Sequence, residues 1–478
     1  ISTPGGYVPP TEKNKNVPLN FAYLTEGADK AESHSFALTE ERQGSYVLLN
    51  MADMHLANRN QDISQFESGF IKDVNDLIKS YEDQGTKVYG ITLGDQSWDA
   101  YWYENSFAIP EAMNEVYKIK CPIYNCMGNH DNNPYVANNN NLASKPWVDN
   151  VCPNYYSFNI GQAHYVILDN INYINNGAAN GVIGDRSYNS ALDPVQLEWF
   201  KKDLATVADK SKPLVICMHI ALNSHIYWSN NKWNQGLSMT SANDLLQAVK
   251  EFTNVKVLTG HTHINFDGHN NDGTVTEHNI AAVCATWWWT GKNGYAGNHI
   301  CRDGSPGGYG VWEVTGPRME MYYKSIGYDR SYQFRTTDIN QVHVTRERFA
   351  PNCTDATLLS KFNNYTYGYE TPNNNNEVQI CVFNYGEGWD IKVTENGNPL
   401  TVTRVAKRDP LQTVSYGLQR LNVNKEPTEG FCALVSSRIF QVTASSPTST
   451  LEIQVTDNYG NVYTETMERP KAFHYLMK

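Results

Sequence analysis

The sequence predicts an α/β layered domain followed by an all-β, Ig-like sandwich. Apolar runs alternate with segments of helical periodicity from about Ser45 onward, and this periodicity fades beyond about Arg335. Short alternating segments with turn signals such as Asn396-Gly397 then fill the rest of the chain. We therefore expect a linker at 1–40, the α/β domain at 41–335 and the sandwich at 336–478.

The α/β domain is expected to begin with the strand "SYVLLN" at 45–50. A helix follows over "FESGFIKDVNDLIKSYEDQG", where Phe66, Phe70 and Val74 recur at helical spacing. Later apolar runs predict further strands in "KVYGITLGD", "CPIYNCMGNHD", "AHYVILDN", "KPLVICMHI" and "VKVLTGHTH". Helices are expected in "DPVQLEWFKKDLATV", with Asp193 as N-cap and Pro194 at its first position, and in "SANDLLQAVKEFT".

Composition excludes several classes of protein. The net charge of -12 and the lack of any Lys/Arg run argue against a nucleic-acid polymer as partner. The nine cysteines are scattered without a C-x-x-C pair, so neither a disulfide scaffold nor a zinc knuckle is expected. No apolar stretch approaches the roughly 20 residues that cross a membrane. The chain begins at Ile1 and not at Met, so we expect it to be processed.

Five polar clusters each follow an apolar run, where ligands bind in α/β folds. They are Asp53-Met54-His55, Gly94-Asp95, Gly128-Asn129-His130-Asp131, His219 and Gly260-His261-Thr262-His263. Imidazoles and carboxylates suit zinc, iron or manganese, and one carboxylate can bridge two ions. Two ions roughly 3.5 to 4 Å apart can bind both oxygens of an in-line displacement and make hydroxide available near neutral pH. The clusters therefore predict hydrolysis of a phosphate ester.

The order and content of these clusters resemble the calcineurin-like metallophosphoesterase superfamily, whose pattern is D-x-H, G-D, G-N-H-[DE], H and G-H-x-H. The resemblance spans about residues 45 to 325 and implies a four-layer α/β/β/α sandwich. By this resemblance, the first metal ion would be held by Asp53, His55 and His263, the second by Asn129, His219 and His261, and both by Asp95. His130 would protonate or stabilise the leaving oxygen, and Asp131 would orient its imidazole.

Other residues leave alternatives open. Asp99 follows Asp95 closely and is a candidate for substrate contact, and His225 is the histidine outside the motifs that is best placed to reach the cleft. We expect Trp287, Trp288 and Trp289 to lie in a strand and fill two core layers. Alternatively, the glycine-rich loop beyond them could offer aromatic rings, Arg302 and Asp303 to the non-phosphate part of a substrate.

The β-rich tail and the segment "ISTPGGYVPP" resemble bacterial members of the superfamily with an accessory β domain at each end. This resemblance implies that residues 1–40 are the remnant of an N-terminal β domain and that the protein is exported to the periplasm or cell surface. The main hypothesis is a binuclear metal phosphoesterase for a small phosphomonoester or phosphodiester, with attack by metal-bound hydroxide. The alternatives are a phosphatase acting on nucleotides or proteins, and a vestigial enzyme that binds a glycan or protein.

Overall fold

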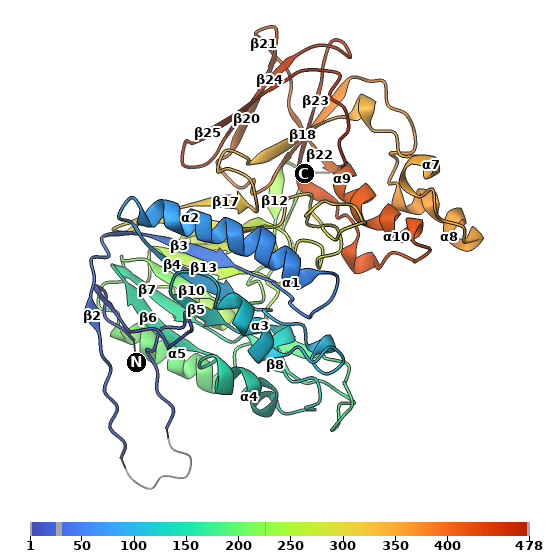
Figure 1. The fold of residues 1–478 in the computed structure, drawn as a ribbon. Coiled ribbons are helices and arrows are strands. Elements are labelled where there is room, and N and C mark those ends of the chain that lie inside the picture. The colour runs from blue at the N-terminus through green and yellow to red at the C-terminus, as the bar shows by residue number, and fades with distance from the viewer. Residues whose placement is uncertain (1, 25–30, 225, 476–478) are drawn as a thin grey trace.

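The computed structural model describes residues 2–24, 31–224 and 226–475. Figure 1 shows a layered α/β body, coloured blue to yellow, with a second body coloured orange to red beside it. Within the described residues, no helix is both long enough and apolar enough to span a membrane.

Two sheets form the centre of the α/β body. The five-stranded sheet has the order β17-β16-β3-β4-β5, in which β3, β4 and β5 are parallel. Its strands span Ser45–Met51 (β3), Lys87–Leu93 (β4), Ile123–Cys126 (β5), Gly308–Thr315 (β16) and Arg318–Ser325 (β17). The six-stranded sheet has the order β14-β15-β13-β10-β7-β6, with β7, β10, β13 and β15 parallel. Its strands span Tyr156–Ile160 (β6), Ala163–Ile167 (β7), Leu214–Cys217 (β10), Val255–Thr259 (β13), Phe266–Asn270 (β14) and Val275–Asn279 (β15).

Helices cover the outer faces of the sheets. They span Asp62–Gln65 (α1), Phe66–Ile71 (η1, a π-helical turn), Lys72–Glu82 (α2), Ile109–Val116 (α3), Asn140–Asn150 (α4), Pro194–Thr206 (α5) and Ala242–Ala248 (α6). One core joins Phe66 of η1 and Val74 of α2 to the five-stranded sheet and to the inner face of the other sheet. A second core joins Phe200 of α5 and Leu245 of α6 to its outer face. The layers are therefore α/β/β/α, as predicted.

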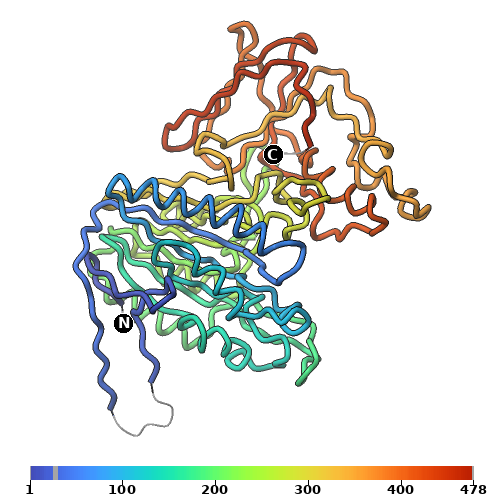
Figure 2. The backbone as a smooth tube through the Cα atoms, in the orientation of Figure 1, coloured from blue at the N-terminus to red at the C-terminus, as the bar shows by residue number. Residues whose placement is uncertain are grey.

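The N-terminal segment lies against the α/β body and away from the C-terminal one (Figure 2). Its strands Tyr7–Val8 (β1) and Thr39–Glu40 (β2) pair with each other. Asn16 is buried and donates two hydrogen bonds of 3.0 Å to carbonyl oxygens at the end of α3. Short ribbons span Ile171–Tyr173 (β8), Tyr188–Ser190 (β9), Tyr227–Ser229 (β11) and Lys232–Asn234 (β12).

The C-terminal body contains two antiparallel sheets, as expected for an all-β domain. One has the order β18-β19-β23-β22 and spans Phe334–Asp338 (β18), Glu377–Val382 (β19), Thr403–Lys407 (β22) and Ser436–Thr443 (β23). The other has the order β21-β20-β24-β25 and spans Asp390–Glu395 (β20), Asn398–Pro399 (β21), Leu451–Thr456 (β24) and Val462–Met467 (β25).

Short helices with a core of their own accompany these sheets, which the sequence interpretation missed. They span Arg346–Phe349 (α7), Ala356–Ser360 (α8), Pro410–Thr413 (α9), Val414–Leu418 (η7) and Gln419–Asn422 (α10). The apolar residues Leu411, Val414, Leu418 and Leu421 recur at helical spacing. This periodicity is the sequence signal that could have predicted these helices.

Arg404 joins the two bodies. Its guanidinium lies 4.3 to 4.9 Å from the centroids of four aromatic rings, two in the β11–β12 ribbon and two in the C-terminal domain. The ribbon also hydrogen-bonds across the boundary, because Trp228 N donates to Ser437 Oγ at 3.0 Å.

Candidate metal centre

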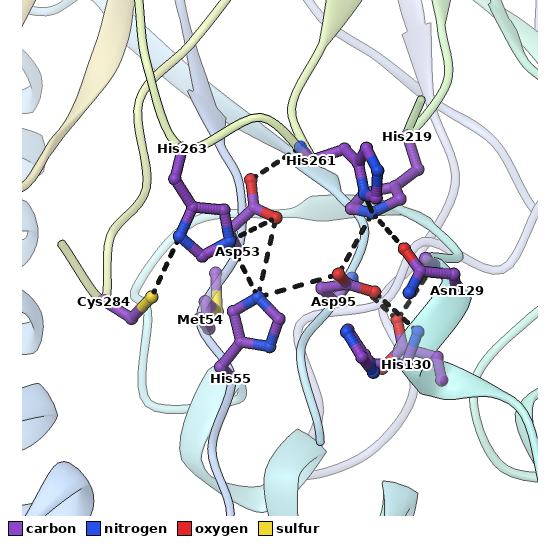
Figure 3. Close-up of polar contacts among 12 residues, drawn as sticks. Asp53, Met54, His55, Asp95, Asn129, His130, His219, His261, His263 and Cys284 are labelled. Atoms are coloured by element: carbon purple, nitrogen blue, oxygen red, sulfur yellow. Dashed lines mark hydrogen bonds and ion pairs between the residues drawn. The ribbon is translucent and has the colours of Figure 1, made fainter. Parts of the chain in front are cut away.

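The seven predicted ligands converge where the carboxyl ends of strands from both sheets meet (Figure 3). Asp53 and His55 follow β3, Asp95 follows β4, Asn129 follows β5, His219 follows β10, and His261 and His263 follow β13. All are buried except His261, which is partly exposed. The topology therefore gathers side chains that are up to about two hundred residues apart, as in the 3.0 Å contact between His55 and His263, which are 208 positions apart.

The backbone at the site is unusual. Asp53, His55, Asp95, His261 and His263 all have left-handed φ angles, between 45° and 68°. Each such residue without glycine's freedom costs roughly 1–2 kcal/mol. Hydrogen bonds between neighbouring turns hold this conformation, because Asp53 N donates to Gly94 O and His55 N donates to Asp95 O.

Two glycines allow the turns to approach each other. A Cβ atom on Gly128 would lie 2.2 Å from Asp95 Oδ1, and one on Gly94 would lie 2.4 Å from His219 Nδ1. Neither space accepts a methyl group without displacing a predicted ligand. The two glycines therefore allow the backbone turns to come close together at the site.

The first group of ligands surrounds a small polar space. His55 Nε2 and His263 Nε2 are 3.0 Å apart, and Asp53 Oδ1 lies 3.3 Å from His263 Nε2. Asp53 Oδ1 is buried and accepts no hydrogen bond from the described residues. His263 Nδ1 faces the Ala285 carbonyl at 3.4 Å, so a proton there leaves the lone pair of Nε2 directed at the space. Buried acceptors that face one another in this way fit a cation.

The second group repeats this arrangement around His219. In the neutral form of His219, Nδ1 donates to the Leu93 carbonyl at 2.7 Å, which leaves Nε2 as an acceptor. That nitrogen nevertheless lies 3.0 Å from Asn129 Oδ1, 3.1 Å from Asp95 Oδ2 and 3.1 Å from His261 Nδ1. A proton on Nε2 could serve only one of these neighbours well, whereas a metal ion among them would be bound by all four residues.

Asp95 lies between the two groups. Its Oδ2 atom is 3.1 Å from His219 Nε2 and 3.6 Å from His55 Nε2, while Oδ1 accepts the backbone N–H of His130 at 2.8 Å. Burial opposes its ionisation, but the histidines around it hold the pKa of Asp95 below its usual value. The carboxylate is therefore charged and placed for a bridging ligand.

The pKa values of the histidine rings are shifted in opposite directions. Burial lowers the pKa of His55 to about 4 and that of His261 to about 3. Burial also acts on His219, but Asp95 outweighs it and raises the pKa of that ring to about 9. Positive charge is thus favoured at His219 beside Asp95, while His55 and His261 stay neutral, as metal ligands must be. The donor set and its electrostatics fit divalent ions.

His130 lies at the open edge of the site, with 22% of its side chain exposed. Asp131 was predicted to orient its imidazole, and this prediction is wrong. The Asp131 carboxylate accepts backbone N–H groups of Asp95, Ser97 and Gly128, each at 2.9 Å, and so fixes two ligand turns. The partner of His130 is Asp99, whose Oδ1 atom accepts from Nδ1 at 2.6 Å.

Asp99 is fully buried and also accepts hydrogen bonds from Arg186 Nη1 and the Tyr173 hydroxyl, each at 3.1 Å. Its pKa is lowered, because His130 and Arg186 outweigh the effect of burial. Burial lowers the pKa of His130, but the charges of Asp99 and Asp95 raise it above its usual value overall. Sequence reasoning placed Asp99 near the site without assigning it this role.

The three tryptophans do not form a strand. Trp287 and Trp288 have φ angles of 47° and 62° and lie in a turn, so the predicted two-layer packing is wrong. Trp288 is buried and donates to the Met54 carbonyl. Trp287 stacks on the ring of His263, with 4.0 Å between centroids, and its other neighbour at 4.0 Å is Phe431 of the C-terminal domain.

The remaining candidates for contact with the substrate were His225, Arg302 and Asp303. His225 lies outside the described residues. Asp303 is buried and accepts from Asn265 N and Ser305, and Arg302 Nε donates to the Cys432 carbonyl. Arg302 and Asp303 therefore make structural contacts within the protein.

Comparison with known proteins identifies two matching families. A family described as calcineurin-like phosphoesterase matches residues 46–265, and one described as the C terminal of calcineurin-like phosphoesterase matches residues 277–463. No curated protein matches the chain.

The solved structures that match this chain have low sequence identity to it. A putative 5'-nucleotidase from Staphylococcus aureus is 12% identical, with 73% of this chain and 74% of that chain covered and a TM-score of 0.35. A phosphopantetheinyl hydrolase from Mycobacterium tuberculosis is 14% identical, with 53% and 95% covered and a TM-score of 0.28. A sulfate thiohydrolase from Thermus thermophilus is 9% identical, with 59% and 56% covered and a TM-score of 0.28.

Proposed function

The chain belongs to the calcineurin-like phosphoesterase family, and from this premise we propose that it hydrolyses phosphate esters at a centre of two metal ions. Membership makes it a metal-dependent phosphoesterase. The number of ions, their ligands and the substrate are our proposal. The observation that carries it is the position of Asp95 Oδ2, between His219 Nε2 at 3.1 Å and His55 Nε2 at 3.6 Å.

We assign the ligands by these contacts. Asp53, His55 and His263 would hold one ion, Asn129, His219 and His261 the other, and Asp95 both. Nitrogen and oxygen donors of this kind accept manganese, iron or zinc. Asn129 would contribute a neutral oxygen, which limits the negative charge that an approaching phosphate meets. When bound, such ions polarise a phosphate ester and lower the pKa of water.

His130 would act on the leaving oxygen. Its Nδ1 atom is held by Asp99 at 2.6 Å, and its backbone N–H is held by Asp95 at 2.8 Å. These two contacts fix both the ring plane and the position of the turn, so Nε2 is the atom available to a substrate. A proton on Nε2 can stabilise or be transferred to the leaving oxygen as the ester bond breaks. Asp99 is a positioning residue in this scheme.

Metal content and turnover test the proposal together. Elemental analysis should find two divalent ions per chain, and the hydrolysis of p-nitrophenyl phosphate or bis-p-nitrophenyl phosphate should disappear on chelation and return with manganese or zinc. The preferred substrate of this pair would distinguish monoester from diester hydrolysis. Retention of full turnover after complete metal removal would overturn the proposal, and so would saturation at one ion with full activity.

A further inference from the structure

Three cationic side chains from distant parts of the chain surround Trp289, beside the candidate metal centre. The Arg420 guanidinium lies 4.6 Å from an indole ring centroid, Lys292 Nζ lies 5.3 Å from it, and the Arg59 guanidinium lies 5.8 Å from it. Arg59 follows β3, Lys292 follows the tryptophans, and Arg420 belongs to α10 of the C-terminal domain. We call Arg59, Lys292 and Arg420 the cationic cluster.

No ion pair with a carboxylate neutralises the cationic cluster in the part of the chain that the structure describes. Within 2–24, 31–224 and 226–475, none of the three side chains forms an ion pair with a carboxylate, although the net charge of the chain is -12. Asp62 is close to Arg59 in the sequence, but its oxygens accept backbone N–H groups of Ala57, Arg59 and Ile63. Like charges repel, so this convergence is unfavourable unless an anion joins it.

Arg420 gives an independent indication of a ligand. Its Nε atom is buried and has no hydrogen-bond partner among the described residues. A buried donor left in this state costs roughly 1–3 kcal/mol. Because a guanidinium offers several donors in a planar fork, it suits the oxygens of a phosphate or carboxylate.

The cationic cluster is separated from the metal centre by one aromatic layer. The Arg59 guanidinium is 4.8 Å from the Trp98 ring, and that ring is 5.4 Å from the His55 ring. These two contacts place Arg59 no more than about 10 Å from a predicted metal ligand, across a single ring contact of ordinary length. The tryptophan turn makes a second connection. Trp287, two residues before Trp289 in the chain, stacks on the ring of His263, another predicted ligand.

We propose that Arg59, Lys292 and Arg420 form an anion subsite for a second negatively charged group of the substrate. The inference rests on the proposed phosphoesterase function and narrows its substrate class. The preferred substrates are phosphate esters that carry another phosphate or a carboxylate within about 10 Å of the scissile phosphate. Arg420 gives the C-terminal domain a direct part in substrate selection.

A matched set of three substrates tests the subsite. We would measure kcat/KM of the metal-loaded protein for butyl phosphate, 1,4-butanediol bisphosphate and 1,6-hexanediol bisphosphate. A bisphosphate should be preferred over the monoester by about tenfold or more, since hydrogen bonds to charged groups are strong. In Arg420→Gln and in Lys292→Gln this preference should fall several-fold, mainly through KM. Arg348→Gln is the control, because Arg348 also lies over two aromatic rings of the C-terminal domain but outside the cluster.

Two outcomes would overturn the subsite. One is a wild-type protein that hydrolyses butyl phosphate as well as either bisphosphate, and the other is an unchanged preference in both cluster variants. If none of the substrates is hydrolysed, the proposed function fails, but the anion subsite is not thereby rejected. The subsite is then tested by calorimetry, in which butane-1,4-bisphosphonate should bind the wild type more tightly than butylphosphonate and lose that advantage in Lys292→Gln. Equal affinities would reject it.

Discussion

The carboxylate of Asp99 offers the sharpest test of how the site acts. Replacing it in Asp99→Asn keeps the size of the side chain and an oxygen that can face His130, but removes the charge. The contact between Asp99 Oδ1 and His130 Nδ1 is 2.6 Å long and buried. A hydrogen bond to a charged group contributes roughly 1.5–3 kcal/mol, so we expect kcat to fall about ten- to hundredfold. The seven predicted metal ligands are untouched, and the metal content should not change.

The loss should depend on the leaving group. An alkyl phosphate releases an alkoxide that needs a proton, whereas p-nitrophenyl phosphate releases a stable anion. If Asp99 acts through His130 on the leaving oxygen, kcat for butyl phosphate should fall much more than kcat for p-nitrophenyl phosphate. KM should change little for either substrate.

Asp73→Asn is the matched control. Asp73 is a carboxylate of the same domain that lies in α2 and binds Lys324 Nζ of β17 at 2.6 Å in a largely buried ion pair, and it contacts none of the predicted ligands through that pair. This variant should be less stable to heat, but the ratio of the two kcat values should stay at that of the wild type. Equal losses on both substrates in Asp99→Asn, with metals retained, would refute the reasoning.

Three further predictions concern other parts of the molecule. His130→Ala should keep its metal and lose turnover by about 10²–10⁴-fold, whereas Asp95→Asn should lose both metal and turnover; metal-replete His130→Ala at the wild-type rate would contradict its assigned role. Trp287→Ala removes the ring that stacks at 4.0 Å on His263, so the affinity for metal should weaken about tenfold in competitive chelation. An unchanged affinity would show that the stack does not support the predicted ligand. Arg404→Ala loses contacts with four rings of both domains and should destabilise the protein by about 2 kcal/mol in calorimetry, while an unchanged melting profile would mean that the domains are held together elsewhere.

The sequence was sufficient to locate the candidate metal centre because the predicted ligands lie in short motifs at strand ends. A residue such as His219 carries little information alone, but its position after a buried strand ties it to the other clusters. Parallel strands bring their carboxyl ends to one edge, so the motifs had to meet if the strands were correct. The same reasoning predicted the helix capped by Asp193, whose side chain accepts from Val195 N at 2.8 Å.

Contacts made by loops were not predictable in this way. Asp99 and Asp131 are both carboxylates close to a motif, and only the turn geometry decides which one reaches His130. Consecutive tryptophans are typical of a strand, but the left-handed backbone at Trp287 overrides that preference. Phe431 contacts Trp287 and Arg420 contacts Trp289 from another domain, and no spacing in the sequence indicates these contacts. The number of ions, their identity and export to the periplasm or cell surface stay predictions.

The left-handed backbone at the predicted ligands implies that the protein would be more stable if other residues, above all glycine, stood at these positions. At Asp53 or His261, alanine would remove the predicted metal ligand and keep the backbone strain, while glycine would remove both. A descendant freed from catalysis could therefore gain stability simply by accumulating glycines at these positions. Asp and His at five left-handed positions in three turns, where glycine would be less strained, are what is expected where function outweighs the preference of the fold.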